Sequence, residues 1–170
     1  MKRSNSVILL LTMIAFTFFG FDCQRWWLVT GCSLLNHLTF NFVHANVFHL
    51  ACNAYCMLLM LWSDNIKWWW WLTALAIVLG VSFILPCNTI TAGFSGVLFA
   101  VIGMTLAEGK LTWKRCVPVI VSLAVSVLLA RNLAAGIHIM SCIVGFVTML
   151  VIKGYGELIE DSRRLDDSLR

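Results

Sequence analysis

The chain has 170 residues, of which 61% are apolar and 12% are charged, and its formal net charge is +4. This composition is too apolar for a soluble core and predicts an integral membrane protein. The basic residues form no cluster with interleaved aromatic residues, which argues against a nucleic-acid-binding protein.

Six apolar runs follow one another, separated by short polar segments, and most approach the roughly 20 residues that cross a bilayer as a helix. The runs cover residues 6–21, 47–62, 68–85, 94–107, 116–130 and 133–152. We therefore expect an all-α, polytopic membrane protein: a bundle of six transmembrane helices in residues 1–153, followed by a charged cytoplasmic tail in residues 154–170.

The first run follows Lys2 and Arg3, as a signal peptide would, and Cys23 also fits a lipoprotein. Phe21 and Asp22 stand where small residues normally precede a cleavage site. We therefore expect an uncleaved helix.

Six spans place both termini on one side of the membrane. Ten of the twelve Lys and Arg residues fall on that side, and only Arg25 and Arg131 fall opposite. Basic loops face the cytoplasm, so we expect cytoplasmic termini. The compact six-helix form favours a multi-pass protein of the bacterial inner membrane.

The seven cysteines include no CxxC pair and no metal-ligand spacing. Three lie within spans and are expected to pack as small apolar residues: Cys52, Cys56 and Cys142. Three lie on the outer side, where a disulfide is chemically possible but its pairing stays open: Cys23, Cys32 and Cys87.

Polar side chains inside the hydrocarbon are costly, so each is a candidate for function. His49 lies 15 residues before Asp64, Ser95 lies 13 before Glu108, and His138 lies 15 before Lys153. At about 1.5 Å of rise per residue, all three sit roughly 20 Å above the inner boundary of the membrane. Asn53 lies one turn deeper than His49.

The run 94–107 is too short to cross the membrane, so we expect the fourth helix to be partly re-entrant and to begin inside the bilayer. The loop before it would then enter the bilayer. Irregular backbone is stable at that depth only where it lies beside protein or a water-filled cavity. Gly93 would allow the turn into this helix, and Gly96 would leave space for a reacting group.

Small residues follow one face of the fourth helix and one face of the sixth, and helices with such faces pack closely. We expect these faces to meet and bring His138 to Ser95. Histidine is the side chain best suited to take the serine proton near neutral pH. All eight acidic residues lie at or beyond the ends of the spans, so this pair is predicted to act as a dyad, with Phe99 stacked on the imidazole.

Acyl transfer also needs hydrogen-bond donors for the developing oxyanion. The backbone N–H of Ser95, the Asn53 amide and His49 are the candidates, because His49 and Asn53 share one face of their helix. His44 lies near the same site, where we expect a structural hydrogen bond.

These residues resemble a known family, the rhomboid intramembrane serine proteases. The resemblance lies in "HANVFHLACN" of the second span, "GFSG" at the fourth helix and "GIHIMSCIVG" in the sixth span. It implies Ser95 as nucleophile, His138 as general base, and His49, Asn53 and the Ser95 N–H as the oxyanion hole. It also implies substrates that are membrane proteins, cut in or near a transmembrane helix that unwinds locally, with water entering from the outer side. The resemblance implies no metal and no cofactor.

Three departures from the family pattern stand out. Where the family often has Trp-Arg in its first loop, this chain has Leu35 and Asn36, which puts the anchoring of that loop in question. Ile137 and Ser141 replace small residues of the sixth-helix motif, and both could widen the contact between helices.

Two other functions compete with proteolysis. A catalytically inactive, derlin-type relative would bind transmembrane helices without cutting them, but such proteins typically lose the serine or the histidine. A small transporter or metal-handling protein could use His44, His49 and His138, but the spans lack carboxylates and repeated halves.

Overall fold

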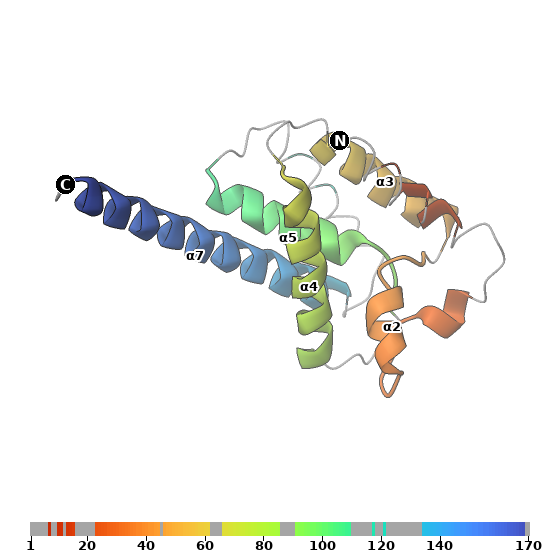
Figure 1. The fold of residues 1–170 in the computed structure, drawn as a ribbon. Coiled ribbons are helices and arrows are strands. Elements are labelled where there is room, and N and C mark those ends of the chain that lie inside the picture. The colour runs from red at the N-terminus through yellow and green to blue at the C-terminus, as the bar shows by residue number, and fades with distance from the viewer. Residues whose placement is uncertain are drawn as a thin grey trace.

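The computed structural model describes residues 7, 10, 11, 13–15, 23–44, 46–61, 66–85, 91–109, 117, 121 and 134–168. These residues are mostly helical and include no strand, as the all-α prediction requires. Figure 1 shows the helices in space. The first and fifth predicted spans lie largely outside the described residues, so the count of six spans stays a prediction.

Four of the predicted spans are helices that begin within one residue of the expected position; the first three also end within one residue of it, whereas the last extends far beyond its expected end. They are α3 (Val47–Leu61), α4 (Trp68–Ile84), α5 (Ser95–Ala107) and α7 (Ala134–Ser168). Within the described part of the chain, α7 alone is long and apolar enough to cross a membrane, and the other three are shorter apolar helices. The segment before α3 holds a short 3₁₀ helix, η1 (Cys23–Trp26), and α2 (Leu34–Thr39).

Local chemistry explains where several of these helices begin and end. The Asn46 side chain accepts a hydrogen bond of 2.8 Å from the His49 N–H and so caps the first turn of α3. Helix α4 stops before Leu85, which is extended as a residue preceding a proline should be. Gly109, with φ +69°, ends α5 in the left-handed conformation that favours glycine.

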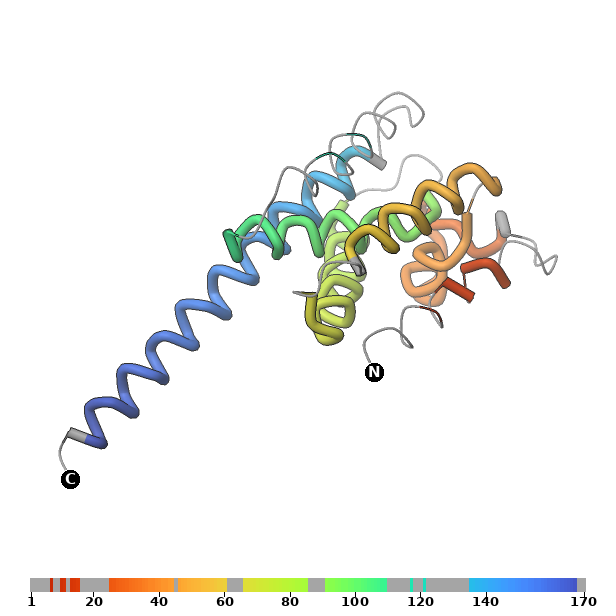
Figure 2. Tube along the Cα trace, turned by 90° about the horizontal axis from the view of Figure 1, so that it is seen from above, coloured from red at the N-terminus to blue at the C-terminus, as the bar shows by residue number. Residues whose placement is uncertain are grey.

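Helix α5 is the centre of the fold. All of its residues except Leu106 are buried, as expected for a helix that is apolar on every side. Helices α3, α4 and α7 all contact it, and its contact with α7 is the most extensive. Figure 2 shows α5 and α7 running alongside each other. Residues at the start of α5 are therefore held from several sides.

The four consecutive tryptophans at the start of α4 do not all face outward. Trp68 is 54% exposed, whereas Trp70 and Trp71 are buried in the core. Successive helical residues point about 100° apart, so four in a row cannot share one face. The cluster therefore both packs the core and presents Trp68 outward.

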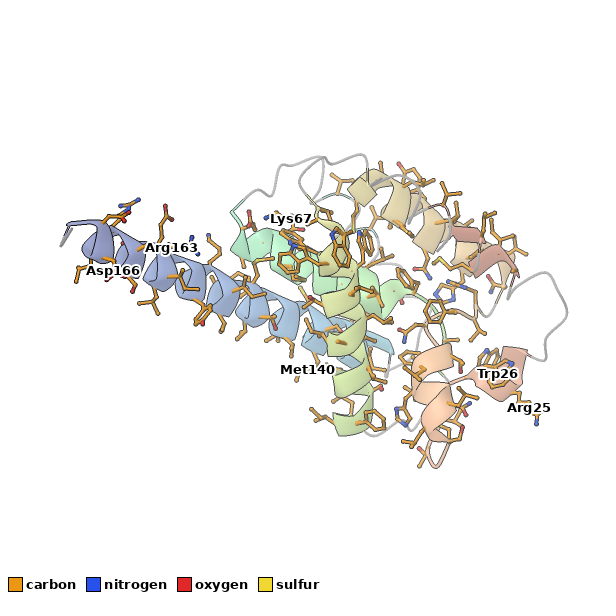
Figure 3. The ribbon with its side chains drawn as sticks, in the orientation of Figure 1. Arg25, Trp26, Lys67, Met140, Arg163 and Asp166 are labelled. Carbon is orange, nitrogen blue, oxygen red and sulfur yellow. The ribbon has the colours of Figure 1, made fainter. Side chains whose placement is uncertain are left out.

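Helix α7 continues past the predicted end of the sixth span at Ile152 and through the boundary drawn at Lys153. Its last turns reach Ser168 and are exposed, with Arg163 and Asp166 far from the other helices (Figure 3). The charged tail is thus helical up to that residue.

Candidate active site

The turn into α5 places Ser95 as the first residue of the helix. Gly93 has φ +114°, a conformation that glycine adopts without strain, and Phe94 forms the cap. The Gly93 N–H donates a hydrogen bond of 2.8 Å to the Phe40 carbonyl. The loop before the serine is therefore fixed to the segment that precedes α3.

The Ser95 hydroxyl meets the imidazole of His138. Ser95 Oγ and His138 Nε2 lie 2.6 Å apart, and both residues are buried. The serine comes from α5 and the histidine from α7, so the contact joins residues 43 positions apart. This is the juxtaposition expected from the two small-residue faces.

Two glycines make this contact between α5 and α7 possible. A Cβ added at Gly103 would overlap the Cys142 carbonyl oxygen, and one added at Gly145 would overlap the Ala100 carbonyl oxygen. The two backbones are thus in direct contact. Ile137 and Ser141, which depart from the family motif, are buried at the same junction without holding the helices apart.

Phe99 stacks on the His138 ring, as expected. The ring centroids are 4.5 Å apart and the planes meet at 20°. His138 Nδ1 is buried and has no hydrogen-bond partner among the described residues. Within this part of the chain, aromatic packing therefore takes the place that a third polar residue would have in orienting the ring.

His49 and Asn53 lie against the turn that leads into α5. A Cβ at Gly93 would be 2.8 Å from His49 Nε2 and 3.2 Å from Asn53 Nδ2. Only glycine fits there. Asn53 Nδ2 is buried and finds no partner among the residues that the structure describes. A free N–H donor thus stands beside the start of α5.

His44 is buried next to His49, with ring centroids 5.2 Å apart in an edge-to-face arrangement. Neither of its ring nitrogens has a hydrogen-bond partner within the described part of the chain. The structural hydrogen bond expected for His44 is not formed there, and its contact with His49 is an aromatic one.

Gly96 does not open a space for a reacting group. A Cβ there would lie 3.1 Å from Val78 Cγ1 and 3.4 Å from Ile137 Cγ2, so side chains from α4 and α7 fill the position. The expectation for Gly96 is corrected accordingly: the glycine allows close helix packing.

The cysteines with described side chains, Cys32, Cys52, Cys56 and Cys142, are free thiols. No group of three or more His, Cys, Asp or Glu side chains lies together among the described residues. The histidines near Ser95 thus have no further metal-binding side chains gathered around them in this part of the protein.

Asn36 contributes to the site's surroundings in a way that sequence analysis missed. It is buried, and its amide bonds to Ser33, Arg25 and Trp27. In the sequence, Asn36 stands out only as a departure from the family pattern. Its bonds to backbone carbonyls could not be predicted, because any residue type can supply a carbonyl and so no motif marks the partners.

A family model described as Rhomboid domain matches residues 31–155. The match contains α3, α4 and α5, and it extends into α7 beyond His138. Comparisons with curated proteins and with solved structures give no significant match.

Proposed function

We propose that this chain, which belongs to the rhomboid family of integral membrane proteins, is an intramembrane serine protease. The family includes such proteases and acts on membrane-protein substrates within the lipid bilayer. The observation that supports the proposal most strongly is the 2.6 Å separation between Ser95 Oγ and His138 Nε2. A buried hydroxyl beside a buried imidazole is the arrangement that nucleophilic catalysis by serine requires.

In the proposed reaction Ser95 Oγ attacks the carbonyl carbon of the scissile peptide bond while His138 Nε2 takes the hydroxyl proton. The imidazolium then protonates the departing amine, which leaves an acyl-enzyme. His138 next removes a proton from water, whose oxygen attacks the ester carbon, and the imidazolium then returns this proton to Ser95 Oγ as the carboxylic acid leaves. This sequence needs Nε2 without a proton in the resting state, so the ring proton sits on Nδ1.

The oxyanion of each tetrahedral intermediate would accept hydrogen bonds from the Ser95 N–H, Asn53 Nδ2 and His49. The buried, unpaired amide of Asn53 and the closeness of both side chains to Gly93 support these roles. Donors that are already fixed need no reorganisation when charge develops. His44 would support His49 through their ring contact, and Phe99 would orient His138 by stacking.

The substrates would be membrane proteins whose transmembrane helix unwinds at the cut, where small or helix-destabilising residues are expected. Helix α5 spans only about 20 Å, which favours a start within the bilayer and a pocket open to the outer side. We propose a bacterial inner-membrane location with cytoplasmic termini. Residues 1–153 form the membrane domain in this proposal, and residues 154–170 form the cytoplasmic tail.

Co-expression with a panel of the host's single-span membrane proteins tests proteolysis against the alternative, a derlin-type protein that binds helices without cutting them. The wild type should release the outer domain of at least one substrate, and Ser95→Ala and His138→Ala should release none while accumulating in the membrane to the same level. Capture of a substrate by the wild type without release, unchanged in Ser95→Ala, would favour the binding protein.

A further inference from the structure

We infer that Asn36 is a positioning residue that holds the loop before Ser95 through the segment preceding α3. The inference rests on the proposed role of Ser95 and deepens it, because Asn36 itself does not contact the serine. It is carried by a chain of hydrogen bonds that runs from the Asn36 amide through Leu28 and Thr91.

The Asn36 side chain joins two parts of the segment that precedes α3. Its Nδ2 donates to the Arg25 carbonyl at 2.8 Å and to the Trp27 carbonyl at 2.9 Å. Its Oδ1 accepts from Ser33 Oγ at 2.6 Å. Both amide protons are used, so this short side chain ties α2 to the backbone at η1. Figure 3 shows η1, which carries Arg25 and Trp26, beside α2.

Both of the parts that Asn36 joins are bonded to the loop before the serine. Leu28, directly after Trp27, exchanges two backbone hydrogen bonds with Thr91, at 2.9 and 3.0 Å. Phe40, directly after α2, accepts the bond from the Gly93 N–H. The loop thus has two attachment points, and Asn36 sets the distance between them.

A small shift of this loop would also displace the groups proposed to take part in the reaction. Gly93 lies against His49 and Asn53, and Ser95 follows it by two residues, with its own N–H at the start of α5. Misplacement by about 1 Å from a remote change can cost a large factor in rate. Asn36 would therefore influence the hydroxyl, its N–H and the neighbouring donors together.

Asn36→Asp tests the inference because it keeps the acceptor for Ser33, removes both N–H donors and directs a carboxylate at two carbonyls. Asn36→Ala removes all three bonds and serves where Asn36→Asp fails to fold. Asn36→Gln keeps the amide group and should therefore retain part of the wild-type behaviour. Leu35→Ala is the matched control, since Leu35 is the adjacent residue of α2 and is 50% exposed.

Two readouts are measured on the full-length protein in detergent. Hydrogen exchange of the Thr91 and Gly93 amides should rise by about tenfold or more in Asn36→Asp, while amides in the middle of α5 stay as protected as in the wild type. The rate of covalent labelling by a serine-reactive phosphonate should fall by about tenfold or more. Leu35→Ala should match the wild type in both.

Wild-type exchange at Thr91 and Gly93 in a folded Asn36 variant would overturn the inference, as would an equal rise across all the helices. Absence of labelling in the folded wild type would instead contradict the proposed function. The exchange measurement would still decide whether Asn36 holds the loop.

Discussion

At the residue scale, the most important contact is the hydrogen bond between Ser95 and His138. Burying either polar side chain in an apolar bundle costs free energy unless it has a hydrogen-bond partner. Their 2.6 Å contact pairs the Ser95 hydroxyl with His138 Nε2, and Phe99 covers one face of the ring, while His138 Nδ1 has no hydrogen-bond partner among the described residues. Aromatic stacking of this kind contributes about 0.5–1.5 kcal/mol beyond the area that it buries. The stacking of Phe99 can therefore orient the His138 ring without a carboxylate.

Asn53→Ala should lower kcat by about 10²–10³ with little change in KM, because an oxyanion donor acts in the transition state and hardly on the bound substrate. The measurement is steady-state cleavage of a purified transmembrane substrate. Tyr55→Phe, on the same helix and 63% exposed, is the control and should leave both constants unchanged. An Asn53→Ala enzyme with wild-type kcat would remove Asn53 from the oxyanion hole.

The site residues that the sequence predicted lie in apolar spans, where a polar side chain stands out, whereas the role of the residue that it missed depends on the folded structure. Ser95, His138, His49 and Asn53 were predictable because polar groups at one depth of apolar spans need a reason to be there. Asn36 was not, since the two carbonyls and the Ser33 hydroxyl that it bonds to are brought together only by how residues 25–33 fold. Gly96 was misinterpreted because only the packed structure shows Val78 and Ile137 filling its place.

Close approach of α5 and α7 is the main feature at the scale of elements. Gly103 and Gly145 bring one backbone against the other, and the Lys153 ammonium donates a hydrogen bond of 3.4 Å to the Ala107 carbonyl at the end of α5. A cation near a helix C-terminus is favourable. The register of the two helices, and with it the Ser95–His138 contact, is thus set at several positions between His138 and Lys153 of α7.

Gly103→Ala should destabilise the protein by about 1–3 kcal/mol or more, because the added methyl group meets backbone that cannot move aside locally. Gly154→Ala is the control: it lies in the same long helix as Gly145 with nothing within 4 Å of the added carbon, and should stabilise by about 0.5–1 kcal/mol. Reversible unfolding in mixed detergent measures both changes. Equal effects of the two substitutions would contradict the close helix contact.

The contact of α2 with α4 should depend on pH through His37, which stacks on Phe83 at 4.0 Å and lies 2.9 Å from Ser82 Oγ through Nδ1. Ser82 Oγ donates to the Leu79 carbonyl, so the His37 Nδ1–H must donate to Ser82. Burial lowers the pKa of His37 below 6.5. Folding therefore favours the neutral ring, and this stability is complete above pH 6.5 and lost as pH falls toward the lower, folded-state pKa.

His37→Gln should show a smaller loss of stability than the wild type between pH 7.5 and pH 5, because the substituted side chain does not titrate. The measurement is the unfolding midpoint of both proteins across this range. Identical pH profiles would show that His37 contributes nothing to the pH dependence.

At the scale of the whole molecule, the apolar runs predicted both ends of α3, α4 and α5 and the start of α7 to within one residue, because run length and breaking residues fix where an apolar helix can lie. The length of α7 was not predictable in the same way. Gly154 and Gly156 are weak helix formers, yet the helix continues through them to Ser168. The exposed Glu160–Arg164 pair, at 3.4 Å, supports it by only a few tenths of a kcal/mol.

The whole arrangement places a central, buried helix with a serine at its first position against a histidine from a neighbouring helix. Labelling of purified protein by a serine-reactive phosphonate tests this claim most directly, with the attachment site read by mass spectrometry. We expect a covalent adduct on Ser95 in the wild type, none in Ser95→Ala, and labelling slowed by about 10²-fold or more in His138→Ala. A folded wild type that takes no label, or a Ser95→Ala protein that is labelled equally, would contradict it.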